Sequence, residues 1–467
     1  MLKKVVLCAT IVKKGGANMY ERYEVLNSFL ENQDFYEKAI DENIKKYRCG
    51  TRKVRLVDKG GKPLSGAKVL VTQKSHQFRF GANLFMLDEL ETDKKNKDYK
   101  DYFCRLFNMA TLPFYWNDCE PERGKPRYDK DSPKWYRRPP VDLCLEFCEE
   151  NGIEPREHAL AYERLFPSWL KDVPVSEIKE AFEKRCQELS RRYAHRINTI
   201  EVTNEMNWHE GTTAFYNEPD YIEWCFKTTE KYFPSNQLVI NEATEEAWLD
   251  VLRPTAKYYA YTEAAILKGA RVDAIGLQFH MFYTKEDEAQ RTRHLYDPIS
   301  LYRHMDLYSR LVNKLQITEV TVPAYSYNSD DEEIQARLLT YLYKLWFSHP
   351  ACEQIIYWNL VDGYAYVPDP TPEKIRRTQG NMSVGENYYY GGLLRFDLTP
   401  KPAYYALENL IKNEWHTCLE LCTDKDGWLE FNGFWGTYEV EVVQDGKTLT
   451  AELSHSSNVE ESSTLII

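Results

Sequence analysis

The chain has 467 residues, a formal charge of −12 and an aromatic content of 14%. Acidic residues outnumber basic ones and no stripe of Lys and Arg occurs, which argues against nucleic acid as a partner. No segment is long and apolar enough for us to expect a membrane span.

The cysteines and the N-terminal residues bear on the compartment. The 11 Cys are scattered without a CxxC pair, and Cys144 and Cys148, one helical turn apart, are interpreted as core residues. Reduced thiols favour a cytoplasmic or anaerobic setting. The apolar run at residues 5–12 resembles the apolar part of a signal peptide. It is followed by two Lys, however, and not by a convincing cleavage site of small residues. We therefore expect a cytoplasmic protein, with secretion or a periplasmic place as the alternative.

The N-terminal part of the chain predicts a helical segment followed by a small β element. Residues 15–47 are charged and amphipathic, which indicates a surface helix within a helical or linker segment over 1–47. Alternating apolar residues at 53–58 and 67–73 flank a Gly-rich turn, and this pattern predicts a β-hairpin within 48–76. The hairpin resembles small immunoglobulin-like modules.

From Phe78 onward, strand patterns alternate with helical patterns. Eight strands are expected at Phe78–Leu84, Met109–Trp116, Glu154–Tyr162, Ile197–Glu205, Gln237–Ala243, Asp273–His280, Leu315–Val322 and Gln354–Val361. Helical patterns lie between them, for example at Glu177–Tyr193, Tyr221–Tyr232, Ala256–Leu267, Ile299–Val312 and Glu332–Phe347, with a last helix at Ala403–Lys412. Eight alternating units predict an α/β fold, a closed parallel (β/α)₈ TIM barrel over residues 77–413.

After Trp415 the strand pattern returns. Strands are expected at Trp428–Phe431, Thr437–Val443 and Leu449–Leu453, with a turn at Asp445-Gly446. Neither this segment, 414–467, nor the hairpin at 48–76 is large enough to fold alone. Because the two ends of a barrel lie close together, we expect both to form one accessory β-sandwich beside it.

Two long insertions follow expected strands, at 119–140 and 363–390. In a barrel such loops lie on the active-site face. Each carries a basic pair, Arg137-Arg138 in the first and Arg376-Arg377 in the second. Solvated surface charge is one reading of these pairs, and contact with acidic decorations of a substrate is the other.

Polar residues gather at the carboxyl ends of the expected strands: His158, Glu163, Asn204, Glu205, Glu242, Gln278, His280, Glu319 and Trp358. Strand interiors of a parallel barrel are expected to be apolar, so polar residues at one end predict a site. An isolated buried Glu is more often structural. Glu205 and Glu319 together, at the ends of two parallel strands, are what acid/base glycoside hydrolysis needs.

Four motifs carry a specific resemblance. They are Glu201-Val202-Thr203-Asn204-Glu205, Gly276-Leu277-Gln278-Phe279-His280, Ile317-Thr318-Glu319 and Lys401-Pro402-Ala403-Tyr404-Tyr405-Ala406-Leu407. Through them the chain over residues 44–412 resembles glycoside hydrolase family 10, whose founding activity is endo-1,4-β-xylanase. The resemblance implies a retaining enzyme with Glu205 as acid/base and Glu319 as nucleophile.

The resemblance also implies roles for the neighbouring residues. His280 would hydrogen-bond Glu319 and keep it oriented and charged. Asn204 would hold the 2-hydroxyl of the sugar, a contact that strengthens in the transition state. Gln278 and His158 would line the subsite of the reacting sugar, and Trp358 would form a stacking wall.

The chain departs from the family pattern at three places. Members of the family usually carry Lys-Trp where this chain has Tyr115-Trp116. They usually carry Trp-His where it has Tyr162-Glu163, and a second Trp where it has Tyr366. The catalytic pair is kept while the wall of the reacting-sugar subsite is altered. We therefore expect substrate contacts from Tyr115, Tyr162, Glu163 and Tyr366, and poor activity on unsubstituted linear xylan.

The expected function is endo-xylanase-like cleavage of xylan or xylan-derived oligosaccharides from plant cell walls, without a cofactor. The same chemistry on another decorated or short plant β-glycan is the first alternative. A non-catalytic carbohydrate-binding protein is the second, and the presence of both Glu205 and Glu319 argues against it. No metal site is expected, because His158 and His280 lack a third ligand at motif-like spacing.

Overall fold

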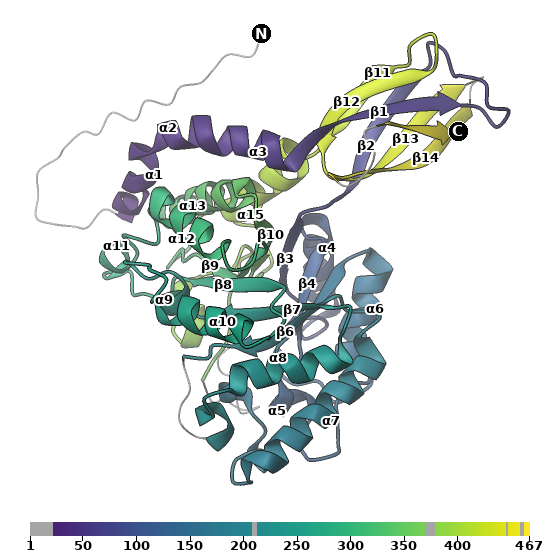
Figure 1. The fold of residues 1–467 in the computed structure, drawn as a ribbon. Coiled ribbons are helices and arrows are strands. Elements are labelled where there is room, and N and C mark those ends of the chain that lie inside the picture. Colours follow the sequence, from purple (N-terminus) through teal and green to yellow (C-terminus); the bar gives the residue numbers. More distant parts are fainter. Residues whose placement is uncertain (1–21, 208–212, 369–378, 445–446, 458–461) are drawn as a thin grey trace, which may run out of the picture.

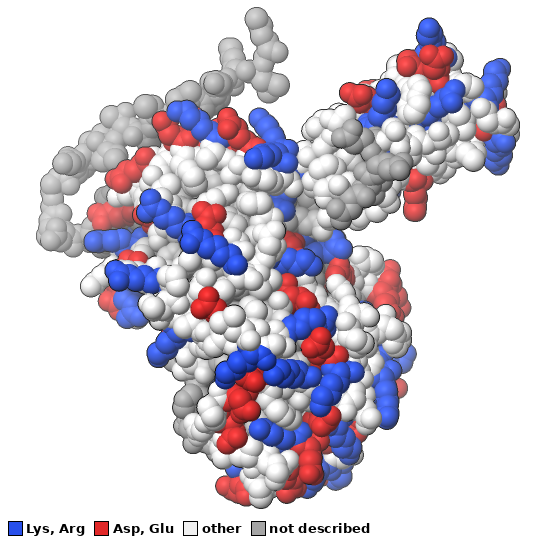
Figure 2. Space-filling model, viewed as in Figure 1, with Lys and Arg blue, Asp and Glu red and all other residues white. Residues whose placement is uncertain are grey.

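The computed structural model describes residues 22–207, 213–368, 379–444, 447–457 and 462–467. The expected turn at Asp445-Gly446, the pair Arg376-Arg377 and the apolar run at 5–12 lie outside the described residues. None of the described helices is both long and apolar enough to cross a membrane. On the face shown in Figure 2, Lys and Arg side chains are interspersed with Asp and Glu rather than gathered in one block.

Eight parallel strands close into the expected barrel (Figure 1). They are β3 (Arg79–Asn83), β4 (Met109–Pro113), β5 (Glu154–His158), β6 (Thr199–Asn204), β7 (Gln237–Glu242), β8 (Ala274–His280), β9 (Leu315–Thr321) and β10 (Cys352–Tyr357). Neighbours follow chain order and β10 pairs with β3 to close the ring. Every residue of β6 and β9 is buried, as expected for barrel strands covered by helices. The predicted barrel is confirmed.

Helices surround the barrel between successive strands. The long ones are α4 (Asp93–Leu106), α6 (Val141–Asn151), α7 (Val175–Tyr193), α8 (Tyr221–Tyr232), α10 (Lys257–Leu267), α12 (Pro298–Tyr308), α13 (Ser329–Ser348) and α15 (Pro402–Asn409), which continues as a π turn, η7 (Leu410–Glu414). Short helical pieces lie in loops: α5 (Trp116–Cys119), η3 (Glu163–Leu165), η4 (Ser168–Leu170), η5 (Ala214–Asn217), α9 (Thr244–Ala247), α11 (Glu288–Arg291) and η6 (Gly385–Tyr389).

A β-sandwich projects from one side of the barrel and is built from strands that come before and after the barrel in the sequence (Figure 1). One sheet has the order β12-β1-β15 and the other β11-β2-β13-β14. The strands are β1 (Cys49–Val57), β2 (Lys68–His76), β11 (Cys418–Cys422), β12 (Trp428–Phe434), β13 (Gly436–Gln444), β14 (Lys447–His455) and β15 (Ser462–Ile466). Val54, Val71, Phe431 and Val440 meet in its core. The expected accessory module is confirmed.

The expected hairpin at 48–76 is wrong, because β1 and β2 lie in opposite sheets of the sandwich. The turn after β1 is present, since Asp58 and Lys62 are joined by a backbone hydrogen bond of 2.9 Å. Both strands bury their alternating apolar faces against each other across the core, and C-terminal strands take their edges: β12 pairs with β1, and β13 with β2. Alternation predicts which face is buried but not which strand pairs.

The N-terminal segment is broken into five short pieces rather than one surface helix. They are η1 (Arg22–Leu26), α1 (Asn27–Glu31), α2 (Gln33–Phe35), η2 (Tyr36–Ile40) and α3 (Asp41–Arg48). They run along the barrel near α12 and α13 (Figure 1), and the Phe29 ring stacks on Tyr341 at 5.0 Å. Phe29 and Ile40 are fully buried, so this segment is part of the barrel core.

Arg22 anchors this segment beside the strand that carries Glu319. Its guanidinium pairs with Glu288 at 2.7 Å and with Asp331 at 3.3 Å, and all three side chains are almost fully buried. It also donates to the carbonyl oxygens of Pro323 and Ala324, just after β9, at 2.5 and 3.3 Å.

We expect Arg22→Ala to lower the free energy of unfolding by about 3–5 kcal/mol, because it leaves the buried carboxylate of Glu288 without its paired cation, whereas Asp331 keeps its pair with Lys285. Lys38→Ala is the matched control: its pair with Asp34 is exposed at 74% and 87%, and such pairs contribute less than about 1 kcal/mol. Urea and thermal unfolding measure both variants. Equal stability of the two would contradict the anchoring role.

Candidate active site

A cleft of about 360 Å³ opens at the carboxyl ends of the barrel strands. Of the residues expected to form the site, His158, Asn204, Glu205, Gln278, His280, Glu319, Trp358, Tyr115, Tyr162 and Tyr366 line it. Because parallel strands end at one face of a barrel, residues far apart in the sequence meet there.

Glu205 follows β6 directly and has a left-handed backbone, with φ of 51°. Such a conformation costs a non-glycine residue about 1–3 kcal/mol and persists only when its surroundings hold it. Its backbone N–H donates to the carbonyl of Asn241 at 3.2 Å. Its carboxylate accepts from the Tyr162 hydroxyl at 2.7 Å and from the Gln278 amide at 3.1 Å. The side chain is therefore fixed on both oxygens.

Glu319 lies within β9 and is 3% exposed. One carboxylate oxygen is 3.2 Å from His280 Nε2 and the other accepts from the Asn241 amide at 3.1 Å. His280 Nδ1 lies 2.9 Å from the Thr321 hydroxyl. Burial lowers the pKa of His280, which favours a neutral ring that accepts from Thr321 and donates to Glu319. The expected hydrogen bond between His280 and Glu319 is present, but the expectation that it keeps Glu319 charged is wrong, because burial raises the pKa of Glu319 to about 8.

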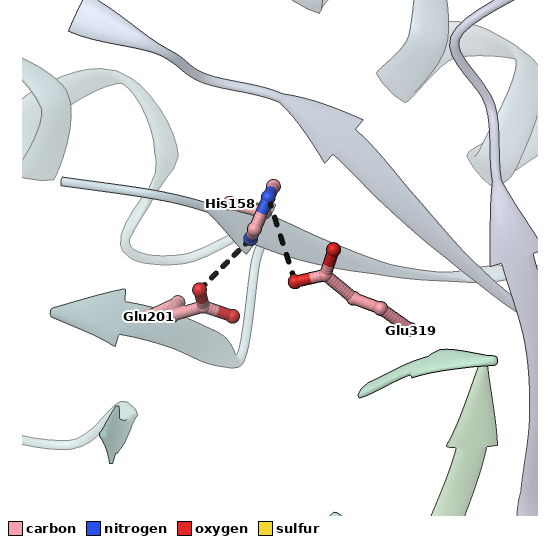
Figure 3. Close-up of side chains that lie close together, drawn as sticks. All are labelled: His158, Glu201 and Glu319. Atoms are coloured by element: carbon pink, nitrogen blue, oxygen red, sulfur yellow. Dashed lines mark hydrogen bonds and ion pairs between the residues drawn. The ribbon is translucent and has the colours of Figure 1, made fainter. Parts of the chain in front are cut away.

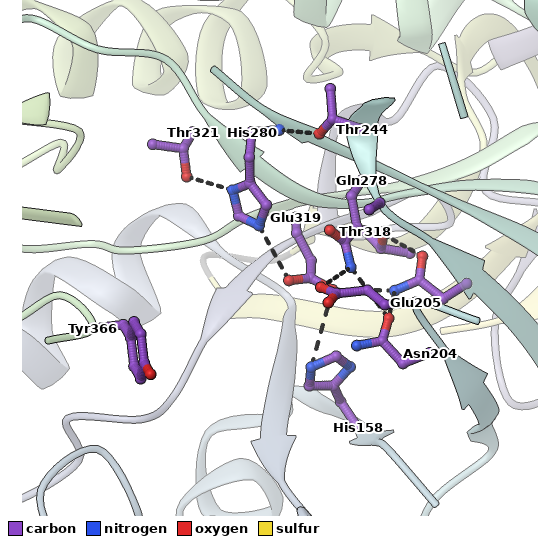
Figure 4. A network of polar contacts seen from close by, with 12 residues as sticks. His158, Asn204, Glu205, Thr244, Gln278, His280, Thr318, Glu319, Thr321 and Tyr366 are labelled. Carbon is purple, nitrogen blue, oxygen red and sulfur yellow. Dashed lines mark hydrogen bonds and ion pairs between the residues drawn. The ribbon is translucent and has the colours of Figure 1, made fainter. Parts of the chain in front are cut away.

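A chain of side-chain amides connects the two carboxylates (Figure 4). The Gln278 amide donates to Glu205 and to Asn204 Oδ1, and the Asn241 amide donates to the same Asn204 oxygen and to Glu319, each at 3.1 Å. Thr318 donates to Asn241 Oδ1 at 2.7 Å. The role of Asn204 at the sugar 2-hydroxyl stays a prediction.

The glycine of the second motif makes room for this chain. A Cβ at Gly276 would lie 2.4 Å from Asn241 Oδ1, closer than real contacts allow. The position of the Asn241 side chain thus depends on Gly276, which belongs to the second motif. Asn241 itself was not predicted from the sequence as a site residue.

A second buried network joins Glu319 to His158 and Glu201 (Figure 3). His158 Nδ1 bonds Glu201 at 2.8 Å, and His158 Nε2 lies 2.9 Å from the Tyr115 hydroxyl and 3.9 Å from Glu319. Arg156 donates to the other oxygen of Glu201. Residues two apart in a strand face the same side, so Arg156 and His158 on β5 both reach Glu201.

Sequence reasoning cited Glu201 only as part of a motif. The available signal was a carboxylate inside an apolar strand, which must have partners. Burial by itself lowers the pKa of His158, but the charges of Glu201 and Glu319 outweigh it and raise that pKa above its ordinary value. Burial raises the pKa of Glu201, and His158 and Arg156 outweigh this and lower it. The network is an ion cluster that places positive charge beside Glu319.

The atoms of His158, Glu201 and Glu319 lie within 4.8 Å of one another, a spacing that a metal ion could use. The donor chemistry does not fit a metal. A protonated His158 donates from both ring nitrogens, while Arg156 occupies Glu201 and His280 occupies Glu319. The oxygen and nitrogen atoms that a metal would need are thus already engaged by other side chains.

Two residues of the expected polar set lie elsewhere. Glu163 is buried but is not among the described residues that line the cleft, and its charge acts on Tyr216 and Tyr221. Tyr162 is extended, and successive residues of an extended chain point to opposite sides, so Tyr162 faces Glu205 while Glu163 faces away. The expected sugar contact of Glu163 is therefore wrong. Glu242 lies behind the cleft and bonds the Tyr261 hydroxyl.

Comparison with known proteins identifies the family of this barrel. Residues 78–410 match the family described as Glycosyl hydrolase family 10. The chain belongs to glycosyl hydrolase family 10.

Several relatives in this comparison are xylanases. Endo-1,4-beta-xylanase 2 of Arabidopsis thaliana is 26% identical over 388 residues, which cover 81% of this chain and 31% of that protein. Anti-sigma-I factor RsgI6 of Acetivibrio thermocellus is 24% identical over 413 residues, covering 87% of this chain and 46% of that protein. The chain thus spans about a third to a half of the length of these curated relatives.

Solved structures share the fold. Xylanase 10B from Thermotoga petrophila, crystallised with xylobiose, has a TM-score of 0.56 at 21% identity and covers 72% of this chain and 95% of that chain. Native xylanase 10B from Thermotoga maritima has a TM-score of 0.57 at 22% identity, with coverage of 72% and 96%. These similarities agree with the family 10 barrel.

The candidate nucleophile of this family 10 protein, Glu319, has an unusually high pKa for a carboxyl group. Burial raises the pKa of Glu319 to about 8, with Glu201 and Glu205 adding to the effect and His158 and Arg156 opposing it. The folded protein therefore keeps a proton on Glu319 that the unfolded chain releases above its ordinary pKa of about 4.3. Stability from this group is present at acidic pH and is lost as pH rises towards 8.

We expect Glu319→Gln, which is neutral at every pH, to match wild type in melting temperature near pH 4 and to exceed it increasingly up to pH 8. The exposed substitution Glu31→Gln is the control and should change little at either pH. Calorimetry across this range measures the difference. A constant offset between Glu319→Gln and wild type would contradict the buried, proton-retaining carboxyl.

Proposed function

We propose that this protein is a retaining β-glycoside hydrolase of xylanase-like chemistry, acting on xylan or xylan-derived oligosaccharides of plant cell walls. The observation that carries the proposal is the connected pair, Glu205 and Glu319, fixed by one chain of amides at the mouth of a family 10 barrel. The relatives that are endo-1,4-beta-xylanases support the substrate class.

In the first step of this mechanism, a Glu319 carboxylate oxygen attacks the anomeric carbon while Glu205 donates its proton to the departing glycosidic oxygen. A glycosyl ester on Glu319 results and the leaving sugar departs as an alcohol. In the second step Glu205 removes a proton from water, which attacks the anomeric carbon and releases Glu319.

The surrounding residues serve these two steps. Neutral His280 and the Asn241 amide donate to the carboxylate of Glu319 and orient it. The Tyr162 hydroxyl and the Gln278 amide hold Glu205 in place while it alternates between acid and base. The attacking form of Glu319 is the ionised carboxylate. Burial makes this the minor form below about pH 8, and positive charge on His158 and Arg156 increases its share.

Retention of configuration tests this mechanism. Two successive displacements at the anomeric carbon must release the β anomer first. Proton NMR of the product of a short β-1,4-xylo-oligosaccharide, recorded before mutarotation, reports the first anomer formed. An initial α anomer would overturn the double displacement.

The substrate wall favours a decorated or short β-glycan over plain linear xylan. The Tyr115 hydroxyl is engaged by His158 and that of Tyr162 by Glu205, so neither is free to replace the sugar contacts of the usual Lys and Trp. Tyr366, at the cleft rim, is 37% exposed. Comparing kcat/KM for linear xylan, decorated xylan and xylo-oligosaccharides tests this preference, and ordinary xylanase rates on linear xylan would contradict it.

A further inference from the structure

The loops after β4 and β10 are tied together across the end of β3. The Tyr136 hydroxyl donates to the carbonyl of Ala365 at 2.9 Å. Arg137 Nη1 donates to Asn359 Oδ1 at 2.6 Å and to the carbonyl of Tyr364 at 2.9 Å. We call these five residues the bridge. Because β3 pairs with both β4 and β10, the bridge passes over the end of β3.

The bridge is built into the fold rather than resting on it. Arg137 is 4% exposed, has a left-handed φ of 62° and lies over the Phe85 ring at 5.4 Å. Asn359 also donates to Glu386 at 3.1 Å. The β10 loop is held at its base by a fully buried ion pair between Asp362 and Lys401, 2.5 Å apart.

The insertion at 119–140 is anchored on its other side as well. Arg138 pairs with Asp118 and lies over the Tyr115 ring at 4.4 Å. Arg127 donates to the carbonyl of Asp118 at 2.7 Å. The middle and the end of the insertion are thus tied to Asp118 on α5, just before its start, and the bridge cannot swing aside as a unit without breaking these contacts.

The bridge stands at one end of the cleft. In an eight-stranded barrel, β7 lies opposite β3. The cleft is lined by Phe85, Arg137 and Glu386 at the β3 side and by Thr244, Glu245 and Phe282 at the β7 and β8 side. The two carboxylates, on β6 and β9, lie between these sides. A glycan bound across the pair therefore extends towards the bridge at one end.

We infer that the bridge closes this end of the cleft, so that the protein removes short units from glycan chain ends instead of cutting within long chains. The inference rests on the proposed function and specifies which glycosidic bonds of the glycan are cleaved. Internal cleavage requires a polymer to leave the cleft at both ends, and Arg137, which lines the cleft and is held by Asn359 and Tyr364, occupies one exit. The cleft volume, about 360 Å³, is near the lower limit for ligand sites and suits a short oligosaccharide.

The experiment compares viscosity with the number of bonds cut. Linear β-1,4-xylan is incubated with the full chain, and specific viscosity is plotted against reducing ends released. Products of end-labelled xylohexaose are followed in parallel. For wild type we expect a slow loss of viscosity per reducing end and one dominant short product from the first time point.

Arg137→Gly opens the bridge with least disturbance, because glycine accepts the left-handed φ at this position without strain. It should raise the viscosity loss per reducing end severalfold and shift xylohexaose cleavage towards internal bonds. Tyr136→Phe removes one bond of the bridge and should give a smaller shift in the same direction. Arg123→Ala, in the same insertion but with an exposed pair to Glu177, is the control and should keep the wild-type pattern.

A steep initial loss of viscosity with wild type would overturn the inference and leave the proposed function intact. The same conclusion follows if opened variants keep the wild-type product pattern. If Arg137→Gly does not fold, Tyr136→Phe and the wild-type pattern still decide. Absence of hydrolysis on xylan, on xylohexaose and on activated β-xylosides would instead overturn the proposed function, and the inference with it.

Discussion

Replacing Glu319 with alanine should lower kcat by about 10⁴-fold or more, because it removes the group that forms the covalent intermediate. The fold should survive, since the buried carboxyl has a pKa of about 8 and is mostly uncharged at neutral pH, so that its loss breaks no buried charge pair. An activated aryl β-xyloside measures the rate, and circular dichroism checks the fold. Glu286→Ala, exposed on the loop between β8 and β9, is the control and should keep wild-type turnover.

A second readout separates chemistry from general damage. Azide added to Glu319→Ala can occupy the space of the carboxylate and attack the anomeric carbon once, which gives an α-glycosyl azide. Recovery of that product would identify Glu319 as the nucleophile. Near-normal turnover of Glu319→Ala without azide would refute the assignment.

Replacing Glu205 with alanine should divide substrates by their leaving groups. Glycans, whose leaving oxygen needs a proton, should slow by about 10²–10⁴-fold. Formation of the glycosyl enzyme from a dinitrophenyl glycoside should stay near the wild-type rate, since that leaving group departs as an anion. Pre-steady-state release of dinitrophenol measures this step directly.

The matched comparison for this variant is Tyr162→Phe, which keeps the carboxyl and removes one of its hydrogen bonds. It should show a smaller loss on glycans, because Gln278 still holds Glu205. Equal losses of Glu205→Ala on both kinds of leaving group would assign Glu205 a binding role instead of proton transfer.

Local patterns in the sequence were sufficient to predict the barrel. The alternation of short apolar strands with amphipathic helices gave all eight strands, because each pattern reflects burial that its own residues determine. Strand pairing in the sandwich was predicted wrongly at β1 and β2, since their partners β12 and β13 lie hundreds of residues away. No local signal in 48–76 distinguishes a hairpin from two strands of opposite sheets.

The candidate site, too, was predicted only in part from the sequence. Polar residues at strand ends were identified one by one, and seven of the nine meet in the cleft. The Arg156–Glu201–His158 cluster and the bridge were not predicted, because each depends on contacts between elements distant in sequence. The expected position of Glu163 was wrong because successive side chains of an extended chain point to opposite sides, and Tyr162 is the one that faces the cleft.

The position of Arg22 has a consequence for how the protein is made. On the ribosome this residue is synthesised long before its partners, because Glu288 lies 266 residues later and Asp331 lies 309 residues later. At about 5–20 residues per second, the N-terminal segment waits roughly 15–60 s for them. During that time Phe29 and Ile40, fully buried in the finished fold, have no barrel to cover them. The nascent chain therefore exposes an apolar segment from early in synthesis until α13, which carries Asp331 and the Phe29 partner Tyr341, has been translated.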